Sequence, residues 1–315
     1  MRILVVGAGA IGGYFGGRLL EAGRDVTFLV RPRRAAQLAK TGLAIRSPRD
    51  DVTLANPPLV MADALRGPYD LILVSSKAYD LAGAADSFAP AVGPDTAILP
   101  LLNGMAHLDY LKTRFGDDKV LGGQCVISVT LDAEGRIVHL NDTHALSFGE
   151  LKGGAASVRA EAIAASFAGA KFDSTLSTAI LQEMWEKWMF IAATAAATCL
   201  MRATVGDIVA AGAVEVTKSL LDECAAIAAA HGFAPREAIK SRSLTMLTMP
   251  GSTFAASMLR DIEKNAPIEA DHIVGDLLRR GAETGKDLRL LHVAYAHLKA
   301  YEMRRRRESA ASRTA

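Results

Sequence analysis

The feature that most restricts the fold of this chain is a glycine-rich run close to the N-terminus, Gly7-Ala8-Gly9-Ala10-Ile11-Gly12. The apolar segment before it, Arg2–Val6, is typical of a strand buried on both faces. The segment after it, Ile11–Ala22, has the pattern of a helix, and Asp25–Val30 that of a second strand. The run therefore lies in a strand–turn–helix–strand unit.

The spacing of the three glycines has a physical reason in such a unit. Gly7 permits a tight turn, Gly9 lets the backbone approach a ligand, and Gly12 lets the helix pack closely on the strand. The helix N-terminus would then supply amide donors and a positive dipole end to a pyrophosphate. A glycine turn in another kind of α/β protein is the alternative, but this context favours a dinucleotide-binding unit.

The rest of the first half continues the alternation of strands and helices, with further apolar runs at Leu71–Ser75 and Thr96–Leu102. This rhythm predicts an α/β domain of Rossmann type, with a doubly wound, mostly parallel sheet. Leu43–Val60 resembles a peripheral hairpin. Three later segments are expected to be antiparallel strands that close the edge of the sheet: Val126–Leu131, Ile137–Leu140 and Ala145–Phe148.

The second half has a different character, because long alanine-rich helical patterns dominate after about Thr178. We expect helices over Thr178–Leu200, Gly212–His231, Met258–Ile262, Ile268–Thr284 and Leu290–Arg307. The predicted organisation is a Rossmann domain over residues 1–177, an all-α domain over 178–308 and a disordered tail over 309–315. The cleft between two such domains is the default ligand site.

Composition excludes several other classes of protein. The 315 residues carry a formal net charge of +2, so the whole-protein field predicts no nucleic-acid or membrane partner. The three cysteines and seven histidines show no metal-binding or disulfide spacing, and a cytoplasmic location follows as an expectation. The run Arg304–Arg307 is interpreted as a solvated helix end, with a basic recruitment tail as the alternative.

The end of the second strand indicates the cofactor. An NAD enzyme usually places a carboxylate there for the ribose 2′-hydroxyl, whereas this chain has Arg31, followed by Arg33 and Arg34. A guanidinium matches a 2′-phosphate, so the sequence predicts NADPH/NADP, although arginines are also common on surface loops.

Two further segments follow predicted parallel strands, where open α/β sheets bind ligands. Lys77 could reach phosphate or ribose, or be a solvated lysine. Asn103 begins an Asn-Gly dipeptide, which is also a common turn.

Two candidates for chemistry lie in the second half. Lys187 shares a helix face with Met184, Phe190, Ile191 and Thr194, so a proton-donating lysine and a snorkelling one are both open. Glu269 falls in the first turn of a helix that begins at Pro267, where a carboxylate also complements the dipole. Tyr295 and Lys299 match a Tyr-xxx-Lys reductase dyad in spacing, but we interpret them as one face of the last helix.

Together these segments resemble the ketopantoate reductase (2-dehydropantoate 2-reductase) family over nearly the whole chain. The order and spacing of the matching pieces carry the resemblance: Gly7–Gly12, Arg31, Lys77, Asn103-Gly104-Met105, Trp185-Glu186-Lys187, Ser257–Asp261 and Glu269–Asp271.

The resemblance implies NADPH-dependent reduction of 2-dehydropantoate to pantoate, for pantothenate synthesis. It implies that Lys187 is the general acid and that Glu269 orients substrate and cofactor. It also implies a substrate segment of Ser257, Met258, Leu259 and Arg260, and makes Asn103 a contact of both nicotinamide and substrate. Cofactor contacts follow at Gly7, Ala8, Gly9, Ala10, Ile11, Gly12, Arg31, Lys77, Asn103 and Ser128.

The chain departs from the family pattern at three positions where asparagine is common, namely Ile191, Ala195 and about Val205. We expect Ser257, Thr194 or Thr198 to supply the missing hydrogen bonds to 2-dehydropantoate. The alternatives are a reductase of a more apolar 2-oxo acid and a non-catalytic NADPH-binding sensor. Oligomeric state is open, with a homodimer possible.

Overall fold

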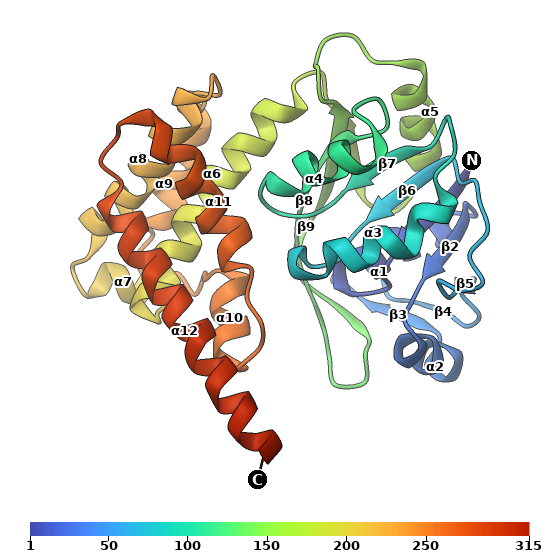
Figure 1. Ribbon diagram of the computed structural model, residues 1–315, viewed down its shortest axis with the longest axis horizontal. Helices are drawn as coiled ribbons and strands as arrows, with labels where there is room; N and C mark the ends of the chain where they lie inside the picture. Colours follow the sequence, from blue (N-terminus) through green and yellow to red (C-terminus); the bar gives the residue numbers. More distant parts are fainter. Residues whose placement is uncertain (315) are drawn as a thin grey trace. The chain divides into compact units, whose positions relative to one another are not determined.

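The computed structural model describes residues 1–314, with side chains through Ala311. The chain divides into two compact units (Figure 1). The first unit comprises Met1–Leu102 and His107–Leu181, and the second comprises Asn103–Ala106 and the residues from Gln182 onward. The division after Leu181, instead of residue 177, leaves the first residues of helix α6 (Ile180–Met201) with the first unit. Within residues 1–314 no helix is long and apolar enough to cross a membrane.

The first unit is built on a five-stranded parallel sheet in the order β5-β2-β1-β6-β7. Its strands are β1 (Arg2–Val6), β2 (Asp25–Leu29), β5 (Leu59–Val60), β6 (Leu71–Val74) and β7 (Ala97–Pro100). All four of its pairings are parallel, which confirms the predicted doubly wound sheet. The strand order reverses between β1 and β6, the switch point where such sheets bind ligands.

A second sheet takes the strands that were expected to close the edge of the first, so that expectation was wrong. It has the order β10-β9-β3-β4, with β8 paired to β9. Its strands are β3 (Leu43–Arg46), β4 (Val52–Leu54), β8 (Leu121–Leu131), β9 (Ile137–Glu150) and β10 (Asp173–Leu176). The strands β8 and β9 form one long antiparallel hairpin, visible in Figure 1, instead of three short strands. The reason is that β9 finds partners in β3 and β10 rather than at the edge of the parallel sheet.

Helix α1 (Ala10–Glu21) packs between these two sheets. Gly12 and Gly16 face the parallel sheet, and Gly13 and Gly17 face the second sheet, as residues four apart on a helix share a side. A Cβ atom added at Gly16 would lie 2.7 Å from the Phe28 ring, one at Gly13 2.5 Å from Ile137, and one at Gly17 2.8 Å from Leu43. The four glycines therefore set how closely the two sheets approach the helix.

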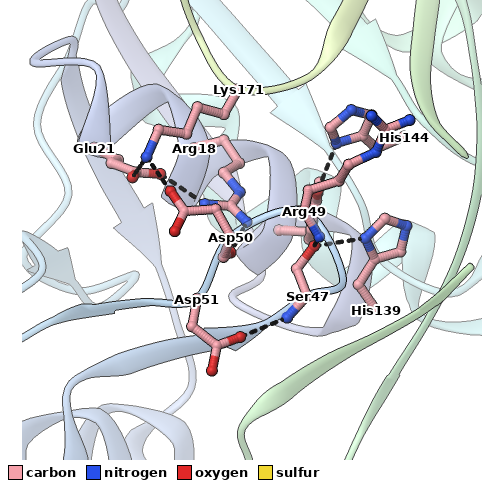
Figure 2. A network of polar contacts seen from close by, with 10 residues as sticks. Arg18, Glu21, Ser47, Arg49, Asp50, Asp51, His139, His144 and Lys171 are labelled. Atoms are coloured by element: carbon pink, nitrogen blue, oxygen red, sulfur yellow. Dashed lines mark hydrogen bonds and ion pairs between the residues drawn. The ribbon is translucent and has the colours of Figure 1, made fainter. Parts of the chain in front are cut away.

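A polar network fixes the C-terminal end of the same helix (Figure 2). The guanidinium of Arg18 is fully buried and donates to Glu21 Oε2 at 2.8 Å and to the carbonyl of Asp50 at 2.5 Å. Lys171 binds Glu21 Oε1 at 2.6 Å and also pairs with the Asp50 carboxylate. These contacts tie α1 to the β3–β4 turn and to the segment that leads into β10.

The remaining helices of the first unit lie on the connections between strands. They are α2 (Pro32–Thr41), the short 3-10 turns η1 (Ala78–Asp80) and η2 (Ala89–Ala91), α3 (Leu81–Phe88), α4 (Ala106–Phe115) and α5 (Val158–Phe167).

The second unit is helical, as expected, but α7 and α9 were not predicted, and the segment over 268–284 and the tail differ from the prediction. Besides α6, its helices are α7 (Val205–Ala210), α8 (Val214–Ala230), α9 (Glu237–Leu247), α10 (Ser257–Glu263), η3 (Asp271–Gly275), α11 (Asp276–Gly281), η4 (Ala282–Thr284) and α12 (Arg289–Thr314). The segment expected to be one helix over 268–284 starts as a π-helix, η3, and Pro267 and Glu269 precede it. The disordered tail expected over 309–315 is helical through Thr314, because residues 309–314 contain neither glycine nor proline to end α12 (Figure 1). Ala315 lies outside the described residues.

The glycine packing predicts a measurable penalty for a single methyl group. Gly16→Ala should lower the free energy of unfolding by about 1–3 kcal/mol, the usual cost of overpacking a core, because its Cβ would meet Phe28 and Val5 within 2.8 Å. Gly83→Ala in α3 is the matched control, since a Cβ there meets nothing within 4 Å. The control should be neutral or about 0.5–1 kcal/mol more stable. Urea denaturation of both variants tests this, and equal stabilities would contradict it.

A buried histidine predicts how stability depends on pH. The Tyr14 hydroxyl of α1 hydrogen-bonds His144 Nδ1 at 2.8 Å, and the His144 ring stacks on that of His139, which in turn bonds Ser47 (Figure 2). Burial, assisted by Arg49, holds the pKa of His144 below its ordinary value of 6.5. The folded state binds a proton here less readily than the unfolded state, so stability should fall as the pH drops below about 6.5.

His144→Gln should make this decline shallower between pH 7 and pH 5, as measured by melting temperature. His292→Gln, at an exposed position of α12, serves as the control. An unchanged pH profile in His144→Gln would show that other groups produce the decline.

Candidate active site

The glycine loop lies between β1 and α1 and has room for a ligand. Gly7 has a φ of +93°, which favours glycine, and its amide donates to the carbonyl of Leu29 at 2.9 Å. A Cβ at Gly12 would lie 2.1 Å from Ser75 Oγ, so this position must be glycine. A Cβ at Gly9 would meet no atom within 4 Å, and Gly9, as the N-cap of α1, offers no side-chain acceptor to the first-turn amides. The loop therefore fits a pyrophosphate, which those amides could bind.

Two residues without a predicted role of their own, Ser75 and Arg34, hold this loop. Ser75 Oγ lies 2.9 Å from the carbonyl of Val6 and 3.2 Å from that of Gly7, so its hydroxyl joins the ends of β1 and β6. Arg34 Nε donates to the carbonyl of Ala8 at 2.8 Å, and its Nη1 donates to the carbonyl of Gly135 at 2.9 Å. Burial lowers the pKa of Arg34. The available signals were the serine at the end of a parallel strand and an arginine one helical turn after Arg31.

The predicted cofactor contacts Arg31 and Lys77 lie at the same edge of the parallel sheet. Leu29 and Val74 both pair with Val6, so the chain leaves β2 and β6 on either side of the glycine loop. Arg31 then caps α2 and Lys77 precedes η1. The structure adds a carboxylate here, since Asp80 pairs with Arg31 at 3.0 Å.

Ser128, the remaining predicted cofactor contact in the first unit, lies in the second sheet. It occupies a bulge in β8, where the register with β9 shifts between Ile127 and Val129, and its amide donates to Asn141 Oδ1 at 2.9 Å. Bulges often lie next to active sites, and this one lies in a different sheet from the strand that leads into the glycine loop. Its cofactor role stays a prediction.

In the second unit, Lys187 is half-buried near the middle of α6. Its neighbours hold that helix firmly in place. Burial alone would raise the pKa of Glu186, but two hydrogen bonds from the Arg236 guanidinium, at 2.5 and 2.8 Å, hold it below its ordinary value. The Trp185 ring stacks on those of His231 and Phe233. The backbone that carries Lys187 is thus fixed on both sides, while its proton-donor role stays a prediction.

The π-helix η3 joins three other elements of this unit through three successive residues. Asp271 accepts hydrogen bonds from Tyr295 at 2.7 Å and Lys299 at 2.8 Å, so the Tyr-xxx-Lys pair of α12 has a structural partner. His272 hydrogen-bonds the backbone of Asn103, and burial lowers its pKa. The carbonyl of Ile273 accepts from Trp188 Nε1 at 2.9 Å, which connects η3 to the helix of Lys187.

Glu269 lies just before η3. The contacts of η3 with α6, α12 and the Asn103-Gly104 turn are called the joint at η3. Its carbonyl accepts from the amide of Ile273 at 2.9 Å, and its side chain is half-buried. The helix starts later than predicted, at Ala270, so Glu269 occupies the N-cap position instead of the first turn. The elements that carry Lys187, Glu269 and Asn103 are bonded to one another inside the second unit.

The predicted substrate segment divides into exposed and buried residues. Ser257 and Arg260 are exposed on α10, whereas the side chains of Met258 and Leu259 are buried. Core packing explains the two buried residues, so only Ser257 and Arg260 keep a side chain that is available to a ligand.

The face of α6 beyond Lys187 offers few polar groups. The hydroxyl of Thr194 donates to the carbonyl of Phe190, and that of Thr198 to the carbonyl of Thr194, both at 2.7 Å. Thr198 also accepts from the amide of Ala256 at 3.3 Å. Both threonines are buried and donate their hydroxyl protons to backbone, so Ser257 is the one exposed residue among the three expected to replace the missing asparagines.

A parallel sheet with a glycine loop at its switch point, together with a basic edge, defines a dinucleotide-binding protein, and comparisons with known proteins narrow the class. The family model described as ketopantoate reductase PanE/ApbA matches residues 3–153, and its C-terminal counterpart matches residues 179–302. The chain belongs to the ketopantoate reductase family, whose members are NADPH-dependent oxidoreductases acting on CH–OH groups.

Individual relatives cover nearly the whole chain. An uncharacterized oxidoreductase, YkpB, from Bacillus subtilis is 37% identical over 96% of this chain and 99% of its own length. The 2-dehydropantoate 2-reductase of Nostoc sp. is 26% identical over 97% of this chain and 96% of its own. The crystal structure of 2-dehydropantoate 2-reductase from Methylococcus capsulatus is 29% identical, covers 97% of this chain and 98% of that one, and has a TM-score of 0.86.

The contact between the Asn103-Gly104 turn and η3 predicts that a methyl group will impair catalysis. Gly104 has a φ of +77°, and a Cβ there would lie 2.9 Å from the carbonyl of His272. Gly104→Ala should shift Asn103 and lower kcat by up to about 100-fold, the scale of a 1 Å misplacement, with a 2-oxo acid that the wild type reduces.

Gly212→Ala is the matched control. Gly212 has a similar φ of +75°, but a Cβ there meets nothing within 4 Å. This variant carries the backbone strain without the collision. Equal kcat values for the two variants would show that the contact with His272 has no catalytic consequence.

Proposed function

We propose that this protein reduces the keto group of a small 2-oxo acid with NADPH. The observation that carries the proposal is the joint at η3, because it bonds together the elements that bear Lys187, Glu269 and Asn103. The glycine loop with Arg31 and Lys77 supports the cofactor half of the proposal.

The chemistry divides among a few groups. Bound NADPH supplies the hydride. Addition of hydride places negative charge on the former carbonyl oxygen, and the Lys187 ammonium would stabilise this charge and then donate a proton to that oxygen. Glu269 would orient the substrate and cofactor, and Asn103 would contact both. Of the substrate segment, Ser257 and Arg260 can reach a carboxylate or hydroxyl, since both are exposed.

Two substrates fit this scheme. Family membership favours 2-dehydropantoate, with pantoate as product and pantothenate synthesis as the setting. The residues of α6 favour a 2-oxo acid with an apolar tail, because Ile191 and Ala195 are hydrocarbon and the nearby threonines are bonded to backbone. A substrate hydroxyl against Ile191 would lose water without gaining a partner, at roughly 1–3 kcal/mol. Because Ser257 is the one exposed hydroxyl among the expected replacements for the asparagines, we propose the apolar acid as the better match to α6.

NADPH oxidation over a panel of 2-oxo acids tests the proposal. We expect turnover of at least one acid, and kcat/KM for 2-dehydropantoate below that for its analogue without the terminal hydroxyl. Ile191→Asn should reverse this order. A strong wild-type preference for 2-dehydropantoate would restore that compound as the natural substrate.

Lys187→Ala is the control for chemistry within the same experiment. It should lower turnover by about 100-fold or more while NADPH affinity changes little. The absence of turnover with every acid, combined with tight NADPH binding, would support the non-catalytic sensor instead. A cytoplasmic location and a homodimer stay predictions.

A further inference from the structure

The edge of the sheet that is proposed to hold the cofactor 2′-phosphate also carries a carboxylate. The 3-10 turn η1 follows Lys77 directly, and the amide of Asp80 donates to the carbonyl of Lys77 at 3.0 Å. This tight turn brings the Asp80 carboxylate back toward the ends of β2 and β6. Asp80 Oδ1 lies 3.0 Å from Arg31 Nη2. The cation expected to bind the phosphate therefore already has an anionic partner.

This ion pair can open. The side chains of Arg31 and Asp80 are 74% and 38% exposed, and exposed pairs contribute between nothing and about fivefold in an equilibrium constant. A 2′-phosphate that binds Arg31 must compete with Asp80 and must also tolerate its negative charge nearby. Arg34 is less accessible than Arg31, because its Nε and Nη1 bind the carbonyls of Ala8 and Gly135 and its Nη2 is buried.

The same carboxylate suits the cofactor that lacks the phosphate. The ribose 2′-hydroxyl of NADH is a hydrogen-bond donor, and dinucleotide-binding domains that use NADH place a carboxylate beside it. In those domains the carboxylate follows the second strand. Here Arg31 takes that place, and the carboxylate comes from the turn after β6, on the other side of the glycine loop.

We propose that Asp80 is a specificity-determining residue that narrows the preference of this site for NADPH over NADH. It acts by competing for Arg31 and by repelling the 2′-phosphate, and it offers an acceptor to the 2′-hydroxyl of NADH. The inference rests on the proposed placement of the 2′-phosphate at Arg31. It is independent of the substrate and of the roles of Lys187 and Glu269.

Equilibrium binding of NADPH and NADH to the full chain, without any 2-oxo acid, tests the proposal. Asp80→Asn should tighten NADPH binding by about fivefold, the upper range for an exposed ion pair, and leave NADH binding unchanged or weaker. The gain for NADPH should shrink as salt is raised from 0.02 M to about 0.5 M, because exposed charges are screened.

Asp86→Asn is the matched control. It removes one carboxylate from the far end of α3, where Asp86 pairs with Arg114 at 2.6 Å, and should leave the NADPH/NADH ratio unchanged. Weaker NADPH binding in Asp80→Asn would show that Asp80 positions Arg31 for the phosphate, and unchanged binding would show that it has no part in selection. Either result overturns the proposal.

Arg31→Ala separates this inference from the cofactor placement. If Arg31→Ala weakens NADPH binding but Asp80→Asn does not tighten it, only the role of Asp80 fails. If Arg31→Ala leaves NADPH binding unchanged, the placement of the 2′-phosphate fails as well.

Discussion

Close packing of α1 against two sheets is the contact on which the first unit depends. Gly12 and Gly16 meet the parallel sheet, and Gly13 and Gly17 meet the second sheet. Close-packed interiors resist even small changes in volume, so these glycines leave the helix no alternative position. Arg18 and its acidic partners then fix the opposite end of the helix. The amides at the start of α1 are consequently held in place before any ligand arrives.

Arg31 and Arg34 lie one helical turn apart, and their surroundings differ. Arg34 has a structural position, whereas Arg31 is positioned to bind a ligand. Arg34 is partly buried, and three of its hydrogen bonds join the glycine loop, α2 and the β8–β9 turn. Arg31 is largely exposed and makes a single contact to Asp80. A guanidinium with several backbone partners is fixed, whereas one with a single exposed partner remains available to a ligand. Chemically identical side chains thus acquire different roles from their surroundings.

The sequence predicted the features that depend on local patterns of residues, and it missed those that depend on contacts between distant parts of the chain. The parallel strands could be predicted because strands buried on both faces have continuous apolar runs such as Leu71–Val74. Helix α2 was not predicted, since Leu38 is its only buried residue and its pattern is mostly polar. The second sheet was misplaced because pairing of β9 with β3 and β10 joins distant parts of the chain.

The same distinction holds for the site. The glycine loop has a local motif, so its position and conformation followed from the residues themselves. The bonds of Thr194 and Thr198 to helix carbonyls, and the pairing of Arg31 with Asp80, depend on side-chain directions that no spacing rule gives. The joint at η3 was also missed, because the hydrogen bonds of a π-helix span one residue more than those of the α-helix that the periodic pattern assumes.

That extra residue limits how the chain can vary in length. Along η3, Asp271 is directed to α12, His272 to the Asn103-Gly104 turn, and the carbonyl of Ile273 to Trp188. Loss of one residue from this stretch would turn its π-helical winding into α-helical winding, and the remaining residues would no longer project in the directions of these three partners. The three attachments could not all be kept. Insertions and deletions should therefore be tolerated in the surface turns of this protein but not within the five residues of η3. The number of residues in η3 fixes which side chain or carbonyl meets each of the three partners.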